Sequence, residues 1–171
     1  ITQGSGTITA QDVGLSATGS IGTSTTSVST TATNLTANAT GSSYVADQAG
    51  NLNLQDSTVN GGFANTAGTT SGDVWYAQSA GSITQTTGST ITANHVGLEA
   101  VGAIGADLLA NNISTTASAI TANAGSDSFV NNTGAVAVNT LSVNGGTLAN
   151  AAGNANVWSL NASGNITQGG G

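Results

Sequence analysis

The chain has 171 residues, one His and seven acids, no Lys, Arg, Pro, Cys or Met, and a formal net charge of −7. Without basic side chains it is poorly suited to bind nucleic acid or an anionic membrane surface, and without Cys it has no disulfide or thiolate metal site. Thr, Ala, Gly, Ser and Asn make up about 70% of the residues, which favours short strands and tight turns over helices.

Short apolar clusters recur along the first half of the chain, separated by Gly, Asn, Ser and Thr. This spacing predicts strands of about three to six residues joined by turns. The clusters lie at Ile8, 13–15, Ile21, Val28, Leu35, Val45, 52–54, Val59, Val74 and Ile83. No apolar run approaches the ~20 residues that a membrane span needs.

The same pattern then begins again. The string ITQ occurs at 1–3, 83–85 and 166–168, and residues 1–22 match 83–105 at fifteen of 22 positions with one insertion. We therefore predict repeat units at 1–82 and 83–165 and the start of a third at 166–171, within one continuous solenoid.

A repeat of this composition predicts an all-β fold, a parallel β-helix (β-solenoid) with about four rungs per 83 residues. In such a fold each rung stacks on the next at ~4.8 Å, so that similar side chains lie directly above one another. Neutral Thr, Ser and Asn tolerate that stacking, whereas charges would repel. Two tandem immunoglobulin-like sandwiches are the alternative, but they would need longer strands and bulkier cores.

The sequence resembles a known group of bacterial proteins. ITQ…GTITA…VGLSATGSIGT, followed by LTANATGSSYVAD, NLNLQDSTVNGG and a closing SAGSITQ, is similar to repeats of giant secreted adhesins whose shafts are of the filamentous haemagglutinin type. The resemblance implies a right-handed parallel β-helix, secretion to the cell surface and a role as a fibre or adhesin. It carries no functional-site residue onto this chain.

Aromatic side chains are the main candidates for packing or contact. Trp75 and Trp158 match between the units, as do Tyr44 and Phe129, which predicts packing roles for these four residues. Phe63 and Tyr76 are replaced by Thr147 and Ser159 in the second unit, so we expect these two to be exposed and to contact neighbouring subunits or fibres.

Polar side chains offer no catalytic or metal site. His95 is the only imidazole and aligns with Asp12, and it has no Cys or carboxylate cluster beside it in sequence. No acid recurs in both units; the seven are Asp12, Asp47, Asp56, Asp73, Glu99, Asp107 and Asp127. We therefore expect no enzyme activity and no cofactor, although backbone carbonyls at one or two turns could hold Ca²⁺.

These observations predict a structural shaft of an extracellular bacterial surface fibre or giant adhesin. Its partners would be identical subunits or adjacent repeats joined head-to-tail, and a host or neighbouring cell surface. Two alternatives remain. One is a carbohydrate- or receptor-binding adhesin module. The other is an ice-binding β-solenoid, because the Thr-x-Thr strings at Thr7, Thr23, Thr31 and Thr90 resemble the Thr arrays of such proteins.

Overall fold

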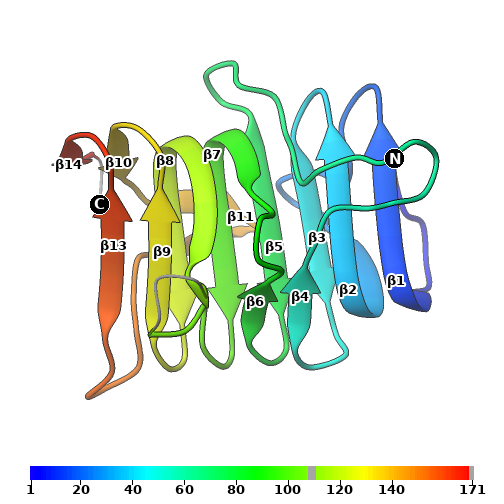
Figure 1. Cartoon of the computed structure of the whole chain (residues 1–171). Helices are drawn as coiled ribbons and strands as arrows, with labels where there is room; N and C mark the ends of the chain where they lie inside the picture. Colours follow the sequence, from blue (N-terminus) through cyan, green and yellow to red (C-terminus); the bar gives the residue numbers. More distant parts are fainter. Residues whose placement is uncertain (108–110, 170–171) are drawn as a thin grey trace.

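The computed structural model describes residues 1–107 and 111–169, which form strands, turns and loops without an α-helix (Figure 1). Nor does this part of the chain contain a helix with the length and apolarity that a membrane crossing requires. Gly170 and Gly171, at the end of the predicted third unit, lie outside the described residues. The strands are β1 (Ile8–Ala17), β2 (Val28–Ala39), β3 (Ser43–Asp47), β4 (Leu52–Leu54), β5 (Val74–Ser79), β6 (Ile83–Gln85), β7 (Ile91–Ala100), β8 (Ile113–Ala124), β9 (Ser128–Asn132), β10 (Val136–Val138), β11 (Leu141–Val143), β12 (Gly146–Leu148), β13 (Trp158–Ala162) and β14 (Ile166–Gln168).

Twelve of these strands form one curled sheet, and all its strand pairs are parallel. Strands β4, β6, β9 and β13 lie at the front in Figure 1, and β10 and β14 lie behind them. Among the strands named for the described residues, only β11 and β12 pair antiparallel, in a separate hairpin. The all-β parallel sheet that the sequence predicts is confirmed, and the tandem antiparallel sandwiches are excluded for the described residues.

The longest strands bend and belong to both faces of the curl. β2 pairs with β3 over Val28–Thr30 and with β4 over Asn34–Leu35. β8 likewise pairs with β9 over Ile113–Thr115 and with β10 over Ala119–Ile120. The chain therefore runs alternately along the front and the back of the sheet. One complete circuit, front and back, is called a pass below.

Two ladders of paired residues follow the two faces. The back ladder consists of Ser43, Trp75, Val96, Ile120, Val138 and Gln168. The front ladder consists of Leu52, Ile83, Ile104, Ser128 and Trp158.

Equivalent residues of the two units lie on opposite ladders. Trp75 is on the back ladder, whereas its equivalent Trp158 is on the front ladder. Counted from Trp75, the chain returns to the back ladder four times, at Val96, Ile120, Val138 and Gln168. Trp158 lies in the chain between the third and the fourth return. One unit therefore spans about three and a half passes, rather than the expected four, and the second unit is turned by half a turn relative to the first.

The core fills the inside of the curl. It consists of Val, Ile, Leu and Ala from both faces together with Trp75. Because parallel neighbours stack at ~4.8 Å, an apolar residue in one pass covers the apolar residue in the next. The core and the sheet run without interruption across residues 82 and 83, because β5 pairs with β7 and β4 pairs with β6.

Glycine lets the chain turn sharply at one corner of the sheet. The amide of Gly81 donates to the carbonyl of Gly50 at 2.8 Å, and the amide of Gly102 donates to Gly81 at 2.8 Å. A Cβ at Gly81 would lie 2.5 Å from the carbonyl carbon of Gly50, so a side chain does not fit there without a backbone shift.

A hairpin covers a different face in each unit. The β11–β12 hairpin packs on Tyr76 and Val74. Its first-unit equivalent is residues 57–63, closed by a bridge between Ser57 and Phe63, and the segment between β4 and β5 crosses the front of β1 and β2 (Figure 1). Both hairpins turn at an Asn with positive φ, followed by Gly, as tight hairpin turns require.

Candidate functional site

The two tryptophans are core residues that hold the faces of the sheet together. Trp75 is fully buried, and its Nε1 donates to the carbonyl of Ala37 at 3.0 Å. Trp158 makes the equivalent bond to Ala122, also at 3.0 Å, but it is only partly buried. Each indole crosses the interior from its own strand to the opposite face.

The second matched aromatic pair is also buried. Tyr44 is 7% exposed and Phe129 is 8% exposed. The Tyr44 ring lies 6.3 Å from the Tyr76 ring, centroid to centroid. Burial is the main cause that raises the pKa of Tyr44 above its ordinary value, and the nearby Asp73 charge adds to it.

Tyr76 is not the exposed contact that its replacement by Ser159 suggests. It is completely buried, beneath Leu141 and Leu148 of the β11–β12 hairpin. Its hydroxyl donates to Glu99 Oε2 at 2.5 Å. Burial, followed by this bond, raises the pKa of Tyr76 far above its ordinary value, so the phenol stays a neutral donor.

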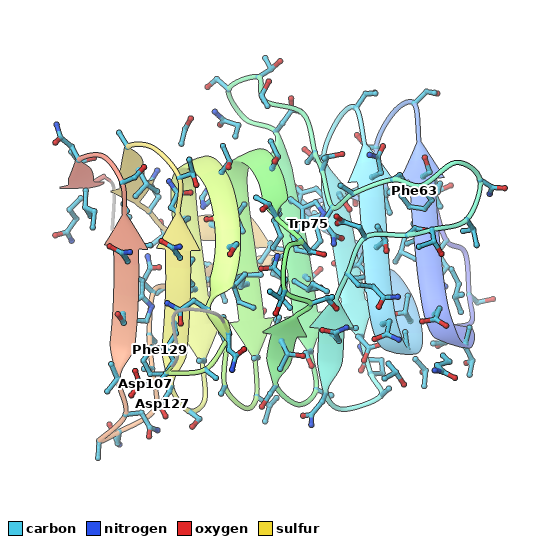
Figure 2. All side chains as sticks on the ribbon, in the orientation of Figure 1. Phe63, Trp75, Asp107, Asp127 and Phe129 are labelled. Carbon is cyan, nitrogen blue, oxygen red and sulfur yellow. The ribbon has the colours of Figure 1, made fainter. Side chains whose placement is uncertain are left out.

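Phe63 is half-buried and acts as a cover rather than a free contact. Figure 2 shows it on the segment that crosses β1 and β2, and its Cζ lies 3.0 Å from the point that a Cβ of Gly14 would occupy. In the second unit Leu141 covers the equivalent Gly97, where a Cβ would lie 2.4 Å from Leu141 Cδ2. The small glycine in each unit lets a hairpin side chain approach the sheet.

Two asparagines, the buried Asn65 and the partly buried Asn150, hold the hairpins to the sheet, and the sequence did not single them out. Asn65 Oδ1 accepts from the Ala37 amide at 2.9 Å, and its Nδ2 donates to the Gln55 carbonyl at 2.9 Å. Asn150 makes the same two bonds in the second unit, at 2.8 and 2.7 Å. The matching strings FANTAG and LANAAG are the sequence signal for this pair. Their alignment makes Leu148, rather than Thr147, the second-unit equivalent of Phe63.

Asp47 and Asn132 share a structural role despite their different charge. Asp47 Oδ1 accepts from Thr30 Oγ1 at 2.9 Å and from the Ala32 amide at 2.8 Å, and its Oδ2 accepts from the Ala49 amide. Asn132 Oδ1 accepts the equivalent two bonds at 2.8 and 2.9 Å. Its Nδ2 donates to backbone carbonyls, including that of Ala117 at 3.2 Å. Both side chains are about 1% exposed and join neighbouring passes of the chain.

The ITQ motif supplies an amide bridge between passes. Gln3 Oε1 accepts from the Ser29 amide at 2.5 Å, and its Nε2 donates to the Ser29 carbonyl at 3.1 Å. Gln85 repeats both bonds with Ser114, at 2.6 and 3.3 Å. In both units the glutamine side chain thus makes two hydrogen bonds like those between paired strands, and in the second unit it does so from the last residue of β6.

The acids do not gather into a metal site. Within the described residues, no group of three or more His, Cys, Asp or Glu is arranged to hold a metal ion. Asp107 and Asp127 lie near the same lower edge in Figure 2, and Asp127 Oδ1 accepts from the Val157 amide at 2.8 Å.

His95 is a partly buried hydrogen-bonding residue. Its Nε2 lies 2.8 Å from Thr121 Oγ1, and this hydroxyl donates to the Asn139 carbonyl at 2.8 Å. Because the hydroxyl has one proton, the imidazole N–H must be the donor between the two side chains. Burial lowers the pKa of His95, which favours this neutral imidazole.

Threonines stack on two sides of the sheet. Thr9 pairs with Thr31, and Thr66, Thr92 and Thr116 pair in turn. These are two short ladders rather than one flat array along the whole sheet.

The two ends of the sheet expose apolar residues whose equivalents at the centre are buried. Ile8 is 37% exposed and Ile166 is 50% exposed, whereas Ile91 and Ile83 are fully buried. Val157 is 52% exposed, against 6% for Val74. Beside Trp158 a hollow of about 720 Å³ is lined in part by Val138, Ala151 and Ile166. This apolar end is the strongest candidate for a contact surface.

No protein family, curated protein or solved structure matches the chain. The functional interpretation therefore depends on the residues, the sheet and its two ends.

Proposed function

We propose that the curled sheet is a right-handed parallel β-helix, and that the chain is a section of the shaft of an extracellular bacterial surface fibre or giant adhesin. The observation that carries this proposal is the continuous parallel sheet, which joins one repeat unit to the next through the same ladders and the same core. Parallel strands joined by crossovers are almost always right-handed, which supports the proposed hand.

The interior chemistry suits a mechanical role. At Asp47, Asn65 and Asn132, buried side chains are satisfied by hydrogen bonds to hydroxyl or backbone groups. None of these bonds depends on a cation, since the chain has no Lys or Arg. A fibre held in this way should keep its strength at high salt, because screening weakens only charge interactions. It also offers trypsin no cleavage site.

A non-enzymatic role agrees with the arrangement of the polar groups. His95 donates to Thr121, and Thr121 gives its own proton to a backbone carbonyl. The hydroxyl proton is therefore not directed at the imidazole, as a nucleophile paired with a base requires. We infer that this pair serves stability.

Electron microscopy of the purified chain tests the proposal. We expect unbranched fibres of constant width that persist in 1 M NaCl, at roughly ten times the ionic strength at which the Debye length is about 10 Å. Discrete compact particles at every concentration would contradict a self-continuing shaft. The proposed location requires a second measurement: antibodies against the chain should label intact source cells, and labelling only after lysis would overturn it.

A further inference from the structure

The contact between the two units inside the chain shows how two units join. β5 at the end of the first unit pairs with β7 at the start of the second, with Trp75 beside Val96 and Gln78 beside Glu99. Trp75 is fully buried there. This internal joint is a template for a joint between separate molecules.

Both partners of that joint are repeated at the ends of the chain. β13 is the second-unit equivalent of β5 and pairs only with β9, while β1 is the first-unit equivalent of the β7 strand and pairs only with β2. Each strand therefore has one unpaired edge within the described residues. Unpaired edges of this kind are templates for pairing with another chain.

We propose that a second copy of this chain docks its β1 on β13 in the register of the internal joint, which places Val13 of the incoming copy beside Trp158 and its Ser16 beside Asn161. This register rests on the proposed shaft function and specifies the contact. The occupant is a second copy because β7, the strand that covers the equivalent surface inside the chain, has the sequence ITANHVGLEA, close to the ITAQDVGLSA of β1.

Burial supports the same occupant. The internal joint buries Val74, Ile83 and Ile91 to 6% exposure or less, while their equivalents Val157, Ile166 and Ile8 are 37% to 52% exposed. The proposed joint brings these three exposed residues into the positions of the three buried ones. It also places no acid opposite an acid, because Asp12 of the incoming copy would lie beside Val157, as His95 lies beside Val74.

The ITQ segments show one adjustment that the joint needs. Ile166–Gln168 of the first copy and Ile1–Gln3 of the incoming copy both correspond to the single segment Ile83–Gln85 of the internal joint. One of them must leave its place when two copies meet. In the free chain, Gln3 is held by its two bonds to Ser29, so a Gln3→Ala substitution should promote the joint.

The half-turn between units fixes how copies follow one another. The half-turn rotations of two successive units add up to a full rotation about the long axis of the sheet. Each copy should therefore show the same face as the copy before it. Seven passes at ~4.8 Å give an axial repeat of about 34 Å per copy.

Disulfide cross-linking tests the register, because the chain has no native Cys. We expect the Ser16→Cys/Asn161→Cys double variant to oxidise into a ladder of dimers, trimers and longer multimers, whereas either single variant stops at dimers. β1 and β13 stand at opposite ends of the sheet (Figure 1), so the bond cannot form within one molecule. The control is Ser16→Cys with Ser159→Cys: a shift of two residues separates the Cα atoms by about 8 Å, beyond the reach of a disulfide at ~7 Å.

The outcomes separate the register from the shaft itself. A multimer ladder from the Ser16/Asn161 pair, stronger than that of the control pair and further increased by Gln3→Ala, supports the joint. Fibres in the microscope with equal or stronger cross-linking in the control pair would overturn the register and leave the shaft standing. If neither fibres nor multimers form in any variant, both proposals are wrong.

Discussion

Trp75 should contribute more to the stability of this chain than any other single side chain. It is the largest of the fully buried side chains among the described residues, and its indole reaches across the core to Ala37. An indole buries roughly 150–250 Å², which at about 25 cal/mol per Å² gives roughly 4–6 kcal/mol. Allowing for the Ala methyl and partial relaxation, we expect Trp75→Ala to lower the free energy of unfolding by about 4 kcal/mol.

Trp75→Phe separates the ring from its hydrogen bond. The Ala37 carbonyl also accepts from the Thr66 amide at 2.9 Å, so loss of the indole N–H leaves this carbonyl with a partner. We therefore expect a smaller cost, about 1–2 kcal/mol, from one hydrogen bond and some lost packing.

Trp158→Ala is the matched control. It removes the same side chain and the same bond to an equivalent carbonyl, but at an edge strand where the indole is only partly buried. We expect about half the cost of Trp75→Ala, or ~2 kcal/mol. Urea unfolding followed by far-UV circular dichroism, at concentrations where the chain is monomeric, measures all three variants. If Trp158→Ala cost as much as Trp75→Ala, or if Trp75→Ala cost less than about 1 kcal/mol, the argument from burial would be refuted.

Other substitutions probe the polar and backbone contacts. Asp47→Ala should cost about 2–3 kcal/mol in urea unfolding, because it strips partners from buried donors, while Asp47→Asn should cost less than about 1. Asn132→Asp should cost more than about 2 kcal/mol, since a carboxylate would face the carbonyls to which the amide donates; equal stability of this variant and wild type would contradict the bonding described. Gly81→Ala should lower the midpoint of thermal unfolding by several degrees, whereas Gly4→Ala, where a Cβ meets nothing within 4 Å, should leave it within about 2 °C. The folded-state pKa of His95 is lowered, so its contribution to stability is fully present above the unfolded value of about 6.5 and is lost as pH falls below it. A His95→Gln variant should show a weaker loss of stability between pH 7 and pH 5, and an unchanged pH profile would exclude this role.

The sequence was sufficient to predict the repeat and the parallel all-β sheet, because both follow from local properties. Short apolar clusters between Gly and Asn turns specify strands, and the return of ITQ and VGL reports the period. The half-turn between units could not be predicted in this way. It depends on which earlier strand each strand joins, and residues such as Trp75 and Trp158 have similar local surroundings on either face.

The candidate contact residues were harder to predict, because their burial depends on segments far away in sequence. Tyr76 has no aromatic equivalent, which favoured exposure, yet a hairpin 65 residues later covers it through Leu141. Gly97, which makes room for Leu141, matches Gly14 in the first unit, so the need for a small residue was visible without its reason. Asn65 and Asn150 were detectable as a matched pair, but nothing in their spacing shows that they bond to Ala37 and Ala122.

The half-turn between units also bears on the bending of a long shaft. A hairpin on one face makes the two sides of a unit unequal, and identical units all facing the same way would add up to a curved rod. Residues 57–63 lie on the front, and the β11–β12 hairpin lies on Tyr76 of the back ladder strand. Any bias toward bending in one unit is therefore opposed by the next. In the proposed shaft, a rod built from such pairs would stay straight over its length, although neither unit alone is symmetric.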